Sequence, residues 1–218
     1  MKPKNKDVIV KERILTKAEG LFAQKGFRAV TVREIINAAN CNLSAVNYYF
    51  GNKKNLYLEV FRARLIPRSK LMQERFKKFL SRQQTSDSPG AVVQALAQAF
   101  FEGPFSDDER QRHYQLMVRE MSQPGEAFDL VFEHVVQPLF QSLAHRFRSV
   151  IPQEIKEERL ILYIESILGM LIHFNYARPI ITRFTGRAYD SSFTEKLVEH
   201  IIDFSLYGLG VNKNKALP

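Results

Sequence analysis

The chain has 218 residues, of which 45% are hydrophobic and 25% are charged, a composition typical of globular proteins. A chain of this length can bury about 70% of the surface that it exposes when unfolded. Collagen-like, intrinsically disordered and disulfide-scaffold classes are therefore excluded. The single cysteine, Cys41, cannot form an intrachain disulfide, and no apolar run near the N-terminus is long enough for a secretory signal. We expect a protein of the reducing cytoplasm.

The formal net charge is +9, and it is unevenly distributed along the chain. Residues 1–53 contain ten Lys or Arg against four Asp or Glu, a net charge of +6, whereas residues 54–218 carry +3. A quarter of the chain therefore holds two thirds of the excess positive charge. This asymmetry suggests a polyanionic partner for the N-terminal part. A solubilising surface or a membrane-surface patch would give the same balance.

Apolar residues at helical spacing predict two helices in the first forty residues. The apolar stripe of the first helix consists of Ile14, Leu15, Ala18, Leu21 and Phe22. This helix is expected to stop near Gly26, because glycine is common just after a helix end. Thr31 and Glu34 have the spacing of a capping box and begin the second helix. The apolar side of the second helix consists of Val32, Ile35, Ile36 and Ala39.

A turn at residues 40–42 separates the second helix from a short third helix at residues 44–50. We assign the contact between these two helices to Ala38, Ala39 and Val46, with Phe50 also facing inward. Three short helices in a basic segment, the last two joined by a tight turn, are typical of a helix-turn-helix DNA-binding domain. The third helix would then present small or polar side chains to the major groove, which admits one helix.

The rest of the chain is also helical in pattern. A fourth helix begins at Lys53, Pro67 should kink or interrupt it, and the periodicity resumes to Leu80. Residues 178–192 look irregular, and a last helix is expected at residues 193–207. No useful length of the chain alternates as strands do, so we predict an all-α fold of about nine helices. Further breaks are expected at residues 83–90, 103–108, 122–125 and 150–153.

The segment from Arg13 to Leu56 resembles the DNA-binding domain of the TetR family of bacterial transcriptional regulators. The matching pieces are RILTKAEGLFAQKGF, TVREIINAA, NCNLSAVNYYF and GNKKNLY, in continuous register. Residues 47–53 are similar to a subgroup with an NY-x-FG-x-K signature. The chain departs from the family in having Asn-Cys at residues 40–41, where Gly-Val is usual, and Asn47, where Tyr is frequent.

This resemblance implies two domains and a regulatory function. Residues 1–53 would form the DNA-binding domain with a basic N-terminal arm, and residues 54–218 a larger helical domain for effector binding and dimerisation. The implied protein is a homodimeric, ligand-responsive regulator, and most simply a repressor that a small molecule releases from a near-palindromic operator. Its two recognition helices would enter successive major grooves about 34 Å apart.

The resemblance, with the chemistry of the side chains, provides the DNA-binding candidates. Thr31 at a helix N-terminus can bind a phosphate through its hydroxyl and backbone N–H, although it could serve only as a cap. Asn47 can donate and accept at once, as bidentate reading of adenine requires. Tyr48 and Tyr49 could instead be packing aromatics. The full set is Thr31, Arg33, Leu43, Ser44, Ala45, Asn47, Tyr48, Tyr49 and Lys53, with Lys2, Lys4 and Lys6 as an arm that could also be merely solvated.

Family members usually dimerise through their last two helices. Residues 160–177 are too apolar for a one-sided helix, which fits a position between the chain's own core and a partner subunit. A transmembrane helix is the alternative, but Glu165 near its centre and His173 argue against insertion. The candidate interface residues are Ile161, Ile164, Leu168, Leu171, Leu197, Ile201 and Phe204.

Aromatic and polar side chains of the middle helices are the candidates for an effector pocket, although a core or surface role is the simpler interpretation of each. They are Phe100, His113, Met117, Phe132, His134 and His173, and they favour an apolar or aromatic small molecule. Metal-ligand spacing, a nucleophile elbow and a phosphate loop are all missing, so we expect no metal, no cofactor and no enzymatic activity. Two alternatives remain: a sequence-nonspecific architectural DNA-binding protein, and an apolar-ligand carrier or enzyme with a vestigial DNA-binding domain.

Overall fold

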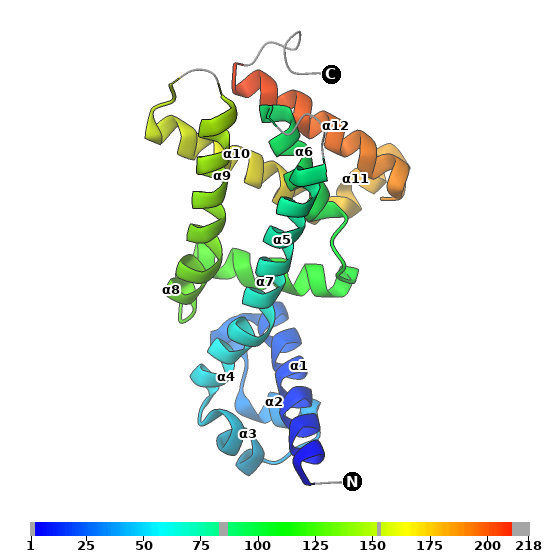
Figure 1. Cartoon of the computed structure of the whole chain (residues 1–218). Coiled ribbons are helices and arrows are strands. Elements are labelled where there is room, and N and C mark those ends of the chain that lie inside the picture. Colours follow the sequence, from blue (N-terminus) through cyan, green and yellow to red (C-terminus); the bar gives the residue numbers. More distant parts are fainter. Residues whose placement is uncertain (1–2, 83–86, 152–153, 211–218) are drawn as a thin grey trace. The chain divides into compact units, whose positions relative to one another are not determined.

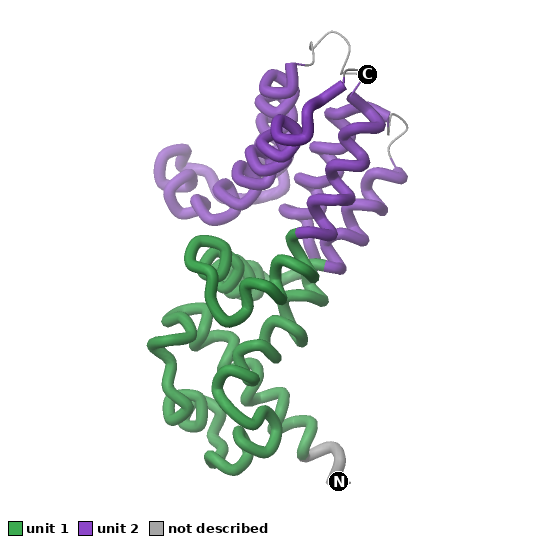
Figure 2. The backbone as a smooth tube through the Cα atoms, turned by 90° about the vertical axis from the view of Figure 1, so that its left-hand side faces the viewer, with its two compact units in different colours: residues 1–69, 105–136 green, residues 70–104, 137–218 purple. Residues whose placement is uncertain are grey.

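The computed structural model describes residues 3–82, 87–151 and 154–210 (Figure 1). Within these ranges every secondary-structure element is helical, as the sequence predicted. The chain divides into two compact units (Figure 2), which are called unit 1 (residues 1–69 and 105–136) and unit 2 (residues 70–104 and 137–218). These units are defined by packing, so the functional boundary expected near residue 53 stays a prediction.

Unit 1 begins with the three helices of the expected DNA-binding domain, α1 (Pro3–Ala29), α2 (Val32–Ala39) and α3 (Leu43–Phe50). The path of α1 breaks at Gly26, whose φ of 81° suits glycine. Ala39 and Val46 are buried together with the apolar stripe of α1. Ala38 is exposed, so its assignment to the contact between α2 and α3 is wrong. Adjacent residues of a helix point about 100° apart, so of this pair Ala39 faces the core and Ala38 faces solvent.

The chain continues from Lys53 through Pro67 without a break. It forms α4 (Lys53–Val60), the π-helical turn η1 (Phe61–Leu65) and α5 (Ile66–Arg82). Pro67 has no N–H to donate to the preceding turn, and a π turn is a local widening that accommodates such a mismatch. The expected effect of Pro67 therefore takes the form of a π turn rather than a gap between two helices.

Three later elements complete unit 1: α7 (Asp107–Ser122), α8 (Phe128–Val131) and η2 (Phe132–Val136). Helix α7 starts with a capping box in which Ser106 and Glu109 exchange hydrogen bonds. It packs along α1, and its buried Leu116 joins the same hydrophobic core as the helix-turn-helix. The expected DNA-binding helices therefore share one core with a helix that lies more than fifty residues downstream.

Unit 2 is built around α6 (Pro89–Phe101), which is buried over most of its length. It packs against α9 (Gln137–Val150), α10 (Glu157–Tyr176) and α12 (Ser191–Gly208). Their shared core is aliphatic and aromatic throughout. Within the described residues no single helix is long and apolar enough to cross a membrane, and α10 meets that test only together with α11 (Arg178–Thr185) across a 69° bend.

The expectation that residues 178–192 are irregular is wrong for more than half of that segment. Residues 178–185 form α11 (Arg178–Thr185), which ends at Gly186 with a φ of 66°. Pro179 lies in its first turn, where a missing N–H costs nothing. Asp190 accepts a hydrogen bond from the Phe193 N–H at 2.8 Å and caps α12, which begins two residues before the predicted start.

Candidate nucleic-acid interface

Local interactions define both ends of α2 and the start of α3. The Thr31 hydroxyl accepts from the Glu34 N–H at 3.2 Å, and the Glu34 carboxylate accepts from the Thr31 N–H at 2.7 Å, which confirms the capping box. Hydrogen bonds from Lys25 and Thr31 lower the pKa of Glu34 to about 2, so the cap stays charged. Asn40 adopts a left-handed conformation with a φ of 45°, which Asn tolerates. The Asn42 side chain caps α3 by accepting from the Ala45 N–H at 2.9 Å.

Arg13 of α1 holds the turn in place. Its Nε donates to the Ala39 carbonyl at 2.6 Å, and its Nη2 donates to the Asn40 carbonyl at 3.0 Å. These carbonyls lie at the C-terminal end of α2, where a cation is favoured. Sequence reasoning missed this role, because nothing in the pattern separates Arg13 from the other basic residues of the first helix.

Helix α3 presents a polar surface outward while two apolar anchors hold it. Val46 and Phe50 are buried. Within the described part of the chain, the side chain of Asn47 makes no hydrogen bond, and that of Tyr48 is 79% exposed. Ala45 is half-buried against the core. The exposed face therefore offers amide, hydroxyl, phenol and aliphatic groups, the chemistry that reads base edges and the thymine methyl. Its members are Leu43, Ser44, Asn47 and Tyr48.

Besides Thr31, which exchanges hydrogen bonds with Glu34, two more of the predicted DNA contacts have partners inside unit 1. The Tyr49 hydroxyl donates to the Asp7 carboxylate at 3.1 Å. The Lys53 ammonium donates to the carbonyls of Phe27 and Val30, both at 3.0 Å, and lies 4.4 Å from the centre of the Phe27 ring. Lys53 therefore ties the start of α4 to the end of α1, and a contact with DNA would compete with these bonds.

Exposed cations lie on either side of the N-terminus of α2. Arg33 was predicted, and its side chain is exposed. Arg28, which the sequence reasoning did not single out, is exposed in the last turn of α1. Thr31 is exposed between them, at the end of the helix where backbone N–H groups favour an anion. The side chains of Lys2, Lys4 and Lys6 lie outside the described residues.

The six effector candidates are divided between the two units, and neither unit holds them all. Phe100 and His173 belong to unit 2, and the other four, His113, Met117, Phe132 and His134, belong to unit 1. Phe100 and Met117 pack against the two hydrophobic cores, whereas Phe132, His134 and His173 are exposed. Burial lowers the pKa of His113 to about 4, and the charge of Arg68 acts in the same direction.

The dimer-interface candidates differ in exposure. Four of them lie in the core of unit 2: Ile164, Leu171, Leu197 and Ile201. Leu168 is half-buried against the same core, Ile161 is exposed, and Phe204 is 60% exposed. A partner surface on these helices would therefore use Ile161 and Phe204 rather than the buried four. Exposed apolar neighbours on α10–α12 are Leu162, Ile180, Phe184 and Tyr207.

Comparison with known proteins places this architecture in a family. Residues 14–60 match the family model described as bacterial regulatory proteins, tetR family. The chain belongs to the TetR family of bacterial transcriptional regulators. Residues 89–209 match the model of the C-terminal domain of the HTH-type transcriptional dual regulator CecR. Within the TetR family, this chain therefore carries a CecR-type C-terminal domain.

Relatives along the whole chain agree with this assignment. The HTH-type transcriptional dual regulator CecR of Shigella flexneri is 26% identical over 215 residues, which cover 91% of this chain and 92% of that protein. The fatty acid degradation regulator FadR from Bacillus halodurans has the same fold, with a TM-score of 0.60 at 16% identity over 94% of this chain and 96% of that one. An HlyIIR mutant protein gives 0.63 at 19% identity, over 90% and 95%. The two structural neighbours, both below 20% identity, show a shared fold.

Proposed function

We propose that this transcriptional regulator is a cytoplasmic, homodimeric repressor that binds a near-palindromic operator and is released by a small molecule. The observation that carries the DNA-binding part is the outward face of α3. Val46 and Phe50 anchor the helix, while Ser44, Asn47 and Tyr48 face solvent. Capped ends and the Arg13 clamp support a rigid presentation of this face, as recognition of base edges requires.

The DNA contacts divide into base readers and phosphate contacts. We assign base reading to Asn47, with Ser44, Ala45 and Leu43 beside it in the groove. Thr31, Arg33 and Tyr48 would contact the backbone and orient α3 in the groove. We assign Tyr49 and Lys53 first to positioning, since their polar atoms bind Asp7 and the end of α1.

The dimer and the effector complete the proposal. Exposed apolar side chains on α10 and α12, among them Ile161 and Phe204, support a subunit contact through these helices. The aliphatic and aromatic core of unit 2 supports an apolar or aromatic effector there. Such a ligand would act only through a difference in its affinity for the DNA-bound and free conformations.

Selection of bound fragments from sheared source-genome DNA, using the purified full-length protein at near-physiological salt, tests the proposal. A recurrent inverted repeat is expected, and Asn47→Ala should bind it more weakly, with a relaxed preference at the base pair that Asn47 reads. Diffuse recovery without a motif by the unsubstituted protein would favour the architectural alternative. Absence of any DNA binding would favour the carrier with a vestigial domain. Because the relative CecR is named a dual regulator, reporter assays at recovered sites should score activation as well as repression.

A further inference from the structure

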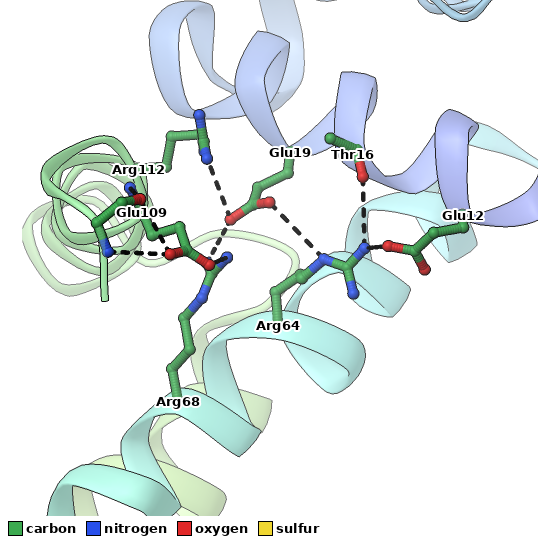
Figure 3. A network of polar contacts seen from close by, with 8 residues as sticks. Glu12, Thr16, Glu19, Arg64, Arg68, Glu109 and Arg112 are labelled. Carbon is green, nitrogen blue, oxygen red and sulfur yellow. Dashed lines mark hydrogen bonds and ion pairs between the residues drawn. The ribbon is translucent and has the colours of Figure 1, made fainter. Parts of the chain in front are cut away.

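An open cavity of about 500 Å³ lies within unit 1, and no residue of α3 lines it. Its walls come from three segments distant in sequence: α1, the η1–α5 junction and the first turns of α7 (Figure 3). Each wall supplies charged groups, so the cavity is suited to a polar rather than an apolar molecule. The charged lining consists of Glu12, Glu19, Arg64, Arg68, Glu109 and Arg112.

Three guanidinium groups converge on one buried carboxylate. Glu19 is 2% exposed and accepts a hydrogen bond from Arg68. The Nε atoms of Arg64 and Arg112 lie 3.8 and 3.9 Å from its oxygens (Figure 3). One carboxylate balances one of the three positive charges. Glu12 and Glu109 balance the other two positive charges, so the charged lining as a whole is neutral and each arginine is stabilised by an anionic neighbour.

The compensating carboxylates, Glu12 and Glu109, are more exposed than Glu19, and their side chains are 55% and 36% accessible. Glu12 pairs with Arg64, and exposed pairs of this kind contribute little to stability. Glu109 meets Arg68 at 3.3 Å through Oε1, while its Oε2 accepts from the Ser106 N–H and hydroxyl, both at 3.0 Å. Another anion can therefore replace either carboxylate at the arginines without removing the cap of α7.

Arg112 has a hydrogen-bond donor that is left without a partner. Among the described residues, its buried Nε has no hydrogen-bond partner, and the 3.9 Å separation from Glu19 is beyond hydrogen-bonding distance. A guanidinium carries five N–H donors in a fixed fork, so an unmade bond at a buried donor is unfavourable. The Arg112 side chain as a whole is 32% accessible and lines the cavity, so a ligand carboxylate can approach its guanidinium there.

We propose that this cavity binds a small organic di- or tricarboxylate. The ligand carboxylates would replace Glu12 at Arg64 and Glu109 at Arg68, and would reach Arg112. The planar arginine forks match carboxylates through paired hydrogen bonds, and the chain's own carboxylates already occupy two of these positions. Such a ligand would link α1 to α5 and α7. An effect on operator binding through α1 rests on the proposed function, whereas the binding itself does not.

Isothermal titration of the full-length protein with citrate, without DNA and at low ionic strength, tests the site directly. We expect saturable binding that Arg112→Gln weakens about tenfold or more, since it removes charge-assisted hydrogen bonds. Arg62→Gln is the matched control. Arg62 is exposed two residues before Arg64, does not line the cavity, and its substitution removes the same charge. It should change the affinity less than about twofold, because exposed charges interact weakly.

Three results would overturn the proposal: no saturable citrate binding, equal losses in both variants, or inorganic phosphate binding as tightly as citrate. Should Arg112→Gln fail to fold by circular dichroism, Arg112→Lys keeps the charge and loses the fork, and it should still weaken citrate more than Arg62→Lys does. Because no DNA is present, failure of the citrate site and failure of operator recognition are separate results.

Discussion

Unit 1 and unit 2 each have an apolar core, but among the described residues only unit 1 buries charged side chains as well. Within the described residues, the buried charged side chains Glu19, Arg68 and Glu120 all belong to unit 1. The core of unit 2 is a cluster of aliphatic and aromatic residues, and Ser205 is its one buried polar side chain among the described residues. Hydrogen bonds to charged groups have strict geometry, whereas apolar contacts are non-directional. Unit 1 is therefore held in one arrangement, and unit 2 is better able to repack around a ligand.

The Glu120 carboxylate shows how directional the contacts of unit 1 are. It accepts from the Tyr57 hydroxyl at 2.6 Å and from the Gly125 and Ala127 N–H groups, both at 3.1 Å. These bonds join α4, which follows α3, to the loop between α7 and α8. The carboxylate also raises the pKa of Tyr57, after the larger effect of burial.

The largest expected effect comes from breaking this cluster. Glu120→Ala would leave a hydroxyl and two N–H donors without partners, and we expect a loss of about 3 kcal/mol or more in the free energy of unfolding. Urea unfolding followed by circular dichroism measures it.

Ser205→Ala in unit 2 is the control for this comparison. The Ser205 hydroxyl is buried and has no hydrogen-bond partner among the described residues. Its removal should change the stability by less than about 1 kcal/mol, because no hydrogen bond is lost. If Glu120→Ala and Ser205→Ala changed the free energy of unfolding equally, the proposed difference between the two units would be wrong.

The next effect is a dependence of stability on pH in unit 1. Burial lowers the pKa of His113 to about 4, below its ordinary value near 6.5, so the unfolded chain takes up a proton first as the pH falls. The stabilisation is therefore present above pH 6.5 and is lost progressively between pH 6.5 and pH 4, by at most about 3 kcal/mol. Urea unfolding across this range measures the slope.

His113→Gln should flatten that slope, since it removes the titrating group. His134→Gln, at an exposed residue of the same unit, is the matched control and should leave the slope in place. A slope that persists in His113→Gln would assign the pH dependence to other groups.

The parts of the site that follow from local chemistry were predictable from sequence. Thr31 and Glu34 cap α2 from three residues apart, and Asn40 supports the turn by its own conformational tolerance. Residues 178–185 were misjudged because a proline in the first turn of a helix looks, in sequence, like a proline that ends one.

The buried charges could not be paired from sequence, because their partners are distant. Arg68 lies 49 residues from Glu19, and Tyr57 lies 63 residues from Glu120. Glu19 did leave a signal, since it shares a helical face with the buried Leu15 and Phe22. The sequence also could not predict that Ile161 is exposed and Ile164 is buried. The spacing of apolar residues is the same for a core and for a subunit interface.

Operator recognition should depend on few side chains, since α3 exposes few. Asn47→Ala should cost about 1–3 kcal/mol on the specific site and relax the preference for its base pair, because bidentate reading is lost. Fluorescence anisotropy with the selected operator and with random DNA measures both. Equal weakening on the two DNAs would remove Asn47 from base reading. Val46 and Phe50 remain as the buried anchors, so folding should be unaffected.

The smallest expected effect separates two basic residues that sequence reasoning had grouped together. Arg33→Ala should lower the salt dependence of DNA binding by about one unit of slope without changing stability, because its exposed guanidinium is available to a phosphate. Lys53→Ala should instead cost about 1–2 kcal/mol of stability, since it removes two hydrogen bonds and a ring contact that join α4 to α1. Salt titrations and urea unfolding of both variants distinguish the roles. If Lys53→Ala instead lowered the salt dependence of DNA binding and left the stability unchanged, Lys53 would be a phosphate contact. Its hydrogen bonds to the end of α1 would then contribute little to stability.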